Sequence, residues 1–171
     1  FLPFLPMLPV QILVNNLIYD VSELGIPFDR VAAEETAKPQ VWDLGALKRF
    51  TFVMGAVSSL FDLTTFVMLL QFFHADEPTF RTAWFVESMA TQILVIFVIR
   101  SRGGLLASRP HPALVASSLG ALAVAAVLPF TPAGAALSFT PLAGGVSMAI
   151  VGIVAVYLAT AYVARRWARP V

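Results

Sequence analysis

The residues best placed to do chemistry lie in the apolar run "LPVQILVNNLIYDVSELGI", which contains Asn16, Asp20 and Glu23. At about 100° per residue of an α-helix, these three side chains project within about 60° of one another. An aspartate at the centre of a membrane helix costs about 2.5–3.5 kcal/mol on insertion, so it needs a partner or a function. Because carboxylate and amide oxygens are the ligands that Mg²⁺ and Ca²⁺ prefer, we predict a metal site at Asn16 and Asp20. Glu23 is a secondary candidate, since it could also extend to the membrane surface.

Two further apolar stretches carry acidic residues. Asp62 shares one helical face with Ser58 and Thr65, and Glu87 lies in a broader arc of polar residues. Asp62 and Glu87 either make structural polar contacts or belong to an ion pathway, and both are kept as secondary candidates for metal ligands. Uncharged polar residues in membrane helices often only bridge neighbouring helices. We expect that structural role for Gln11, Asn15, Ser58, Ser88 and Gln92.

The composition is that of a membrane protein. Of 171 residues, 58% are hydrophobic and only 12% are charged, against roughly 25% charged in ordinary soluble domains. The net charge of +1 is a small difference between 11 basic and 10 acidic residues, and it gives no indication of a nucleic-acid partner. Cysteine is absent, which excludes disulfides, thiolate metal sites and a cysteine nucleophile.

A membrane-spanning helix needs about 20 mostly apolar residues. On that basis the sequence predicts one all-α domain over residues 1–171, a polytopic membrane helix bundle of about five transmembrane helices. Because the polar residues are concentrated in the first three spans, we expect these three to surround a polar interior and the last two mostly to face lipid. The expected spans are 8–25, 50–72, 82–99, 112–130 and 145–164.

The basic residues predict the orientation of these spans. Ten of the eleven fall on one side of the membrane in the five-span arrangement, and only Arg81 falls on the other. Since cytoplasmic loops are enriched in Lys and Arg, we expect a cytoplasmic C-terminus and an N-terminus outside. The chain begins with Phe1, without a signal peptide, so we expect it to begin within a longer protein. The ten residues are Arg30, Lys38, Lys48, Arg49, Arg100, Arg102, Arg109, Arg165, Arg166 and Arg169.

Five motifs occur in one register. They are "LPMLPVQILVNNLIYDVSELGIPFDRV", "KPQVWD", "RFTFVMGAVSSLFDLTTFVML", "WFVESMATQILVIFVIRSR" and "LPFTPAG". In order, spacing and wording they resemble the C-terminal membrane region of the bacterial magnesium-transporting P-type ATPases, from Phe1 to about Gly134. The resemblance implies that the predicted spans are equivalent to helices six to ten of such a pump in the bacterial inner membrane. It also implies that ATP hydrolysis elsewhere in the pump drives magnesium transport.

The same resemblance places Asn16 and Asp20 at cation-site positions of the sixth helix, with Mg²⁺ as the transported ion. It matches Glu87 to an acidic position of the eighth helix that is a ligand in some relatives. The sequence contains no "DKTG" or "TGE" motif and no nucleotide-binding domain. We therefore expect no catalytic or cofactor-binding residue here, and no ATPase activity from this chain alone. The expected partners are the lipid bilayer and the remaining helices and cytoplasmic domains of the pump.

Two other functions fit the same residues. One is a free-standing small membrane carrier or channel that uses the polar faces of the first three spans as a pore. The other is a noncatalytic membrane interaction protein derived from a pump. In the first, oligomerisation would supply the missing ligands, and an initiator methionine with a ribosome-binding site just upstream of Phe1 would favour it.

Overall fold

The computed structural model describes residues 2–29, 43–100 and 109–168. Within these ranges all regular structure is helical, which confirms the all-α prediction. The elements are α1 (Pro9–Glu23), the 3₁₀ turn η1 (Ile26–Phe28), α3 (Leu44–Val67), the π-helical turn η2 (Met68–Phe72), α4 (Glu77–Ile99), α5 (Pro112–Val127), the 3₁₀ turn η3 (Leu128–Phe130), α6 (Pro132–Ala136) and α7 (Gly144–Ala168).

The described helices support a multi-pass membrane protein. Four helical segments are long and apolar enough to cross a membrane, and they match the last four predicted spans. The first predicted span, 8–25, forms α1, which has 15 residues and is therefore about 22 Å long at 1.5 Å per residue. That is shorter than the roughly 30 Å hydrocarbon layer. The four longer segments are Leu44–Phe72, Glu77–Ile99, Pro112–Phe130 and Gly144–Trp167.

Capping residues make two helices start earlier than predicted. The Asp43 side chain accepts hydrogen bonds from the backbone N–H groups of Gly45 and Ala46, so α3 begins about two turns before its apolar stretch. In the same way the Asp76 side chain accepts from the N–H of Thr79 at the start of α4. A carboxylate satisfies N–H groups that lack a partner in the first turn. Polar residues therefore belong to these helices although hydropathy alone assigns them to loops.

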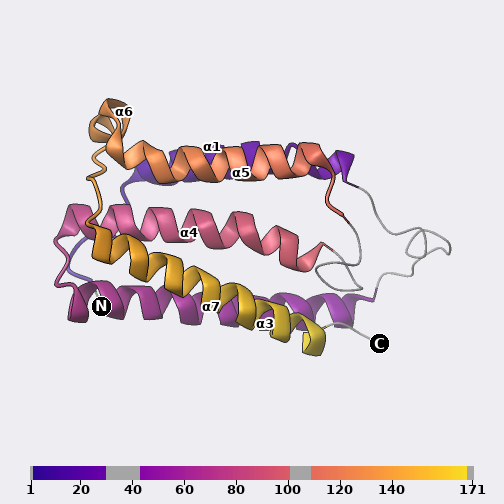
Figure 1. Ribbon diagram of the computed structural model, residues 1–171. Coiled ribbons are helices and arrows are strands. Elements are labelled where there is room, and N and C mark those ends of the chain that lie inside the picture. The colour runs from indigo at the N-terminus through magenta and orange to yellow at the C-terminus, as the bar shows by residue number, and fades with distance from the viewer. Residues whose placement is uncertain (1, 30–42, 101–108, 169–171) are drawn as a thin grey trace.

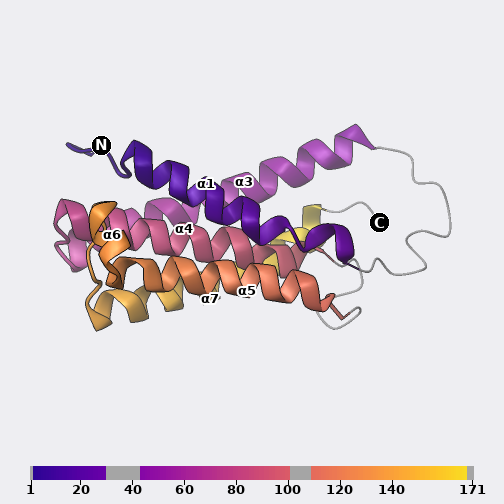
Figure 2. The same cartoon turned by 90° about the horizontal axis from the view of Figure 1, so that it is seen from above.

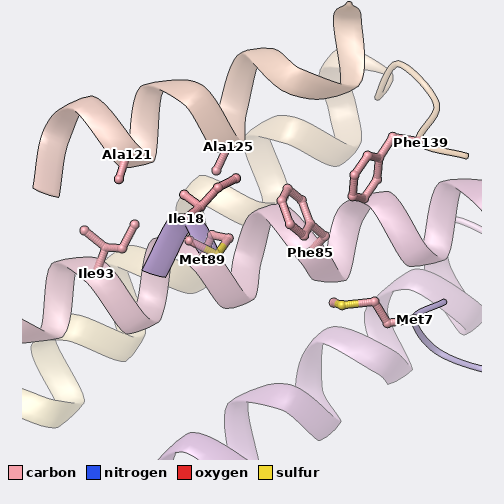
Figure 3. Close-up of a cluster of buried hydrophobic side chains, with 8 residues drawn as sticks. All are labelled: Met7, Ile18, Phe85, Met89, Ile93, Ala121, Ala125 and Phe139. Carbon is pink, nitrogen blue, oxygen red and sulfur yellow. The ribbon is translucent and has the colours of Figure 1, made fainter. Parts of the chain in front are cut away.

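Helix α4 occupies the middle of the bundle. Helices α1 and α5 pack together on one side of it, and α3 and α7 on the other (Figure 1; Figure 2). In the most apolar stretch of α4, half of the residues are buried, against 28% in each of α5 and α7 and 11% in α3. The last two spans thus expose most of their surface, as predicted, but α3 exposes still more. A buried cluster joins α1, α4 and α5: Met7, Ile18, Phe85, Met89, Ile93, Ala121, Ala125 and Phe139 (Figure 3).

The chain alternates between the two ends of the bundle. The C-terminal ends of α1, α4 and α7 and the N-terminal ends of α3 and α5 lie at one end, opposite α6 (Figure 1). The basic residues near that end which the structure describes are Lys48, Arg49, Arg100, Arg109, Arg165 and Arg166, whereas Arg81 lies at the start of α4. Arg30, Lys38, Arg102 and Arg169 lie outside the described residues. Among the described residues, the basic side chains are therefore concentrated at the end of the bundle opposite α6.

An ion pair holds the C-terminal end of α1 against the neighbouring helices. The Asp29 carboxylate accepts hydrogen bonds from Arg100 Nε at 2.8 Å and Nη2 at 2.9 Å, and from the His111 backbone N–H at 2.9 Å. Nearby, Gly25 lies so close to α5 that a Cβ atom there would sit 2.3 Å from the Leu114 Cα. These contacts join the segment after α1 to the end of α4 and the start of α5.

Candidate cation-binding sites

The rotation of α1 about its axis is set by polar contacts on one face. Gln11 Nε2 donates to the carbonyl oxygens of Leu137 and Ser138, each at 3.2 Å. At the other end of the helix, the Ser117 and Ser118 hydroxyls donate to the carbonyl oxygen of Ser22. This face is buried against α5 and the loop after α6, which confirms the structural role predicted for Gln11.

The opposite face of α1 carries the predicted metal ligands. Asn16 and Asp20 are both exposed at the surface of the described structure, one helical turn apart, among exposed Leu13 and Leu17. Glu23 is half-buried. No group of three or more His, Cys, Asp or Glu side chains able to hold a metal occurs among the described residues. Asn16 and Asp20 thus lie on the face of α1 that points away from the other described helices.

Asp62 and Glu87 occupy a different place. Both line a cavity of about 210 Å³ between α3, α4 and α7. Asp62 Oδ1 accepts a hydrogen bond from Trp84 Nε1 at 3.0 Å, while Glu87 Oε2 is buried and has no hydrogen-bond partner among the described residues. The remaining lining residues are Tyr19, Ser58, Phe61, Ser88, Thr91, Gln92, Val95 and Tyr157. The five candidate ligands therefore divide into separate groups, one on the outer face of α1 and one inside the bundle.

Several uncharged polar residues also line the cavity. Ser58 of α3 and Tyr157 of α7 join their hydroxyls at 3.1 Å, so the helix contact predicted for Ser58 is confirmed. Gln92 Nε2 donates to Ser88 Oγ at 2.6 Å within α4. Asn15 is buried, but its Oδ1 has no hydrogen-bond partner among the described residues. The expected polar interior therefore exists, but the last span, α7, also lines it.

The sequence interpretation did not include Tyr157, Tyr19 or Trp84 among the candidate site residues. Tyr157 is 4% exposed and brings a hydroxyl group into the cavity from the last span, which was expected mostly to face lipid. Tyr19 lines the cavity from α1 and also interacts with the Glu23 carboxylate. A buried tyrosine hydroxyl usually has a hydrogen-bond partner, so a tyrosine within an apolar span was an available signal.

Comparisons with known proteins agree with this architecture. The family described as "Cation transporting ATPase, C-terminus" matches residues 4–167. A protein named magnesium-transporting ATPase, P-type 1, from Escherichia coli strain K12 is 46% identical over 106 residues, which are 60% of this chain and 12% of that protein. A protein of the same name from Salmonella typhimurium strain LT2 is 39% identical over an equal length.

The chain spans only 12% of the length of these curated relatives. The family match, by contrast, covers nearly all of this chain and includes every spanning helix described above. The chain therefore belongs to the family of cation-transporting ATPase C-terminal membrane regions.

Proposed function

We propose that this chain is the C-terminal membrane part of an ATP-driven magnesium pump, and that α1 supplies part of the transport site through Asn16 and Asp20. The observation that carries the proposal is the exposed position of these two residues on α1. Gln11, Asn15 and Ser22 are buried against the rest of the chain, whereas Asn16 and Asp20 face outward. The polar residues of α1 thus lie on two faces. One face packs against the rest of the chain, and the other is open to a further partner.

Lipid is an unfavourable partner for the open face. A carboxylate in the middle of a membrane helix costs about 2.5–3.5 kcal/mol, and such groups normally face a bundle interior or a water-filled cavity. Further helices of a pump covering α1 would remove Asp20 from lipid and complete its surroundings. The relatives named above are longer than this chain, which spans 12% of their length. We propose that segments of this kind complete the site.

The chemistry of the two side chains suits Mg²⁺. This ion prefers octahedral oxygen coordination and keeps several of its waters, so it is often held by one or two carboxylates rather than by a full set of protein ligands. Asp20 supplies the charge, and Asn16 supplies an amide oxygen one turn away without adding charge. Magnesium as the transported ion also agrees with the names of the curated relatives.

The proposed setting follows from the same family. The chain lies in the bacterial inner membrane as the equivalent of helices six to ten, with the basic end of the bundle and the C-terminus in the cytoplasm. ATP binding and the aspartyl-phosphate step belong to cytoplasmic domains outside this chain. The segregation of described basic residues supports this orientation, since cytoplasmic ends carry the excess of Lys and Arg.

The test is magnesium uptake by a chimaera in which this chain replaces the corresponding segment of the Escherichia coli relative. Asp20→Asn keeps the size of the side chain and deletes its charge, so uptake should fall at least tenfold at normal expression and membrane insertion. Asn16→Ala should weaken the apparent magnesium affinity. Two controls are matched to these changes.

Asn15→Ala removes the same group from the buried face of α1, and Glu77→Gln removes a carboxylate from an exposed position at the start of α4. Both should leave the apparent affinity unchanged. Near-normal uptake by the Asp20→Asn chimaera, or no uptake by the unmodified chimaera, would contradict the proposed function.

A further inference from the structure

Three helices are connected through His111, which immediately precedes α5 at the end of the bundle opposite α6 (Figure 1). The backbone N–H of His111 donates to the Asp29 carboxylate at 2.9 Å. The same carboxylate pairs with Arg100 at the end of α4. The Phe28 ring of η1 stacks on the imidazole, with the two ring centroids 6.3 Å apart. A change at His111 therefore reaches the segment after α1 and the end of α4 as well as the start of α5.

The imidazole of His111 also caps α5. Its Nδ1 atom accepts a hydrogen bond from the backbone N–H of Ala113 at 3.2 Å. That N–H belongs to the first turn of the helix, where backbone donors have no partner within the helix. The residues that usually occupy this position, Ser, Thr, Asp and Asn, accept through an oxygen atom. A neutral imidazole has one nitrogen that can accept, whereas an imidazolium has none. The cap of α5 therefore exists only while His111 is neutral.

Protons can reach this cap under ordinary cellular conditions. Histidine is the side chain whose charge normally changes between about pH 5 and 8. His111 is half-buried rather than enclosed. The other histidine of the chain, His74, is exposed in the turn between η2 and α4, at the opposite end of the bundle. The chain thus contains one histidine that caps a helix and one that serves as a natural comparison.

The charges around His111 determine what a protonated ring would do. A positive ring would be repelled by Arg100 and by the positive end of the α5 dipole. It would be attracted by Asp29, whose carboxylate already contacts the backbone of the same residue. Helix α5 itself has no ionisable side chain. The described charged residues on the elements that meet here are Asp20 and Glu23 of α1, Asp29 after η1, Arg100 at the end of α4 and Arg109 before α5.

We propose that His111 is a pH-sensitive switch at the junction of α1, α4 and α5. The neutral ring caps α5 through the Ala113 N–H. The protonated ring releases that N–H and turns toward Asp29, where it competes with Arg100. The junction is tight, since a Cβ atom on Gly25 would lie 2.6 Å from the Ala113 carbonyl oxygen. Loosening the first turn of α5 therefore also loosens the end of α1. The proposal does not depend on a metal-binding role of Asn16 and Asp20.

The first experiment measures amide hydrogen exchange at Ala113 by nuclear magnetic resonance, on the ¹⁵N-labelled chain in detergent micelles. The protection factor corrects for the intrinsic pH dependence of exchange. In the unmodified chain, protection of Ala113 should fall at least fivefold from pH 7.5 to pH 5.5, because the cap is lost. In His111→Asn the amide oxygen accepts at both pH values, so protection should stay constant. His111→Ala has no acceptor and should show low protection at both.

His74→Asn is the matched control, because it removes the exposed histidine and leaves the cap in place. This chain should lose Ala113 protection on acidification as the unmodified chain does. Equal protection of Ala113 at pH 7.5 and pH 5.5 in the unmodified chain would overturn the proposal. An equal loss in the His111→Asn chain would overturn it too, since acidification would then act through another group.

A second measurement uses the unmodified chain and so does not depend on the folding of any variant. The ¹⁵N chemical shifts of the His111 ring report whether Nδ1 carries a proton. At pH 7.5 Nδ1 should be unprotonated, as expected of the acceptor from Ala113. Nδ1 should gain its proton over the same pH interval in which Ala113 loses protection. A ring that stays neutral while Ala113 loses protection, or a protonated Nδ1 with Ala113 still protected, would contradict the switch.

Discussion

The ion pair between Asp29 and Arg100 should stabilise the bundle more than any exposed pair in the described residues. Its side chains are only 15% and 8% exposed, respectively. Breaking a buried pair by removing one partner typically costs about 3–5 kcal/mol. In Asp29→Asn the amide oxygen can still accept the His111 N–H bond, and Arg100 keeps interactions beyond this pair. We therefore expect a loss of about 2–3 kcal/mol in the free energy of unfolding, below the full cost.

The assay is unfolding of the chain in mild detergent by increasing the mole fraction of sodium dodecyl sulfate, followed by helical circular dichroism. The matched control is Glu77→Gln, which breaks the pair with Arg81 at the other end of the bundle. Because Glu77 is 44% exposed, that change should cost no more than about 1 kcal/mol. The Arg100→Gln chain and the double variant complete a cycle that isolates the pairwise energy. If Asp29→Asn cost no more than Glu77→Gln, the reasoning about burial would be refuted.

Three further predictions concern packing, helix rotation and orientation. Gly25→Ala should cost about 1–3 kcal/mol of unfolding free energy through overpacking, because the new Cβ would lie 2.3 Å from the Leu114 Cα, while Gly55→Ala, with open space around it, should be neutral or stabilising in the same titration. Gln11→Leu should cost about 1–3 kcal/mol because it leaves the Leu137 and Ser138 carbonyls without this donor; an unchanged midpoint would show that these bonds do not hold α1. Leu44 is the first residue of α3 and Ala136 the last of α6, and the start of α3 and α6 lie at opposite ends of the bundle (Figure 1). Cysteines introduced at these two positions should react from the cytoplasm and from outside, respectively, and labelling of both from one side would contradict the orientation.

Hydropathy and helical periodicity determine much of this structure from local sequence. A run of about 20 apolar residues forms a helix in a membrane because its backbone groups must be satisfied within the segment. The same periodicity separates Asn16 and Asp20 from Gln11 and Asn15 on α1, and the structure keeps these faces apart. Helix ends were less predictable, since Asp43 and Asp76 extend α3 and α4 through capping bonds that hydropathy does not measure.

Which polar face of α1 turns inward was decided only by the tertiary structure. Gln11 is buried because it meets the carbonyl groups of Leu137 and Ser138, more than a hundred residues away along the chain. The cavity likewise required α7 to place Tyr157 opposite Ser58, although the last span was expected mostly to face lipid. Periodicity assigns side chains to the faces of one helix, whereas the partner of each face depends on helix packing between distant segments. For that reason the sequence predicted the candidate ligands, and the fold divided them between an open surface and an internal cavity.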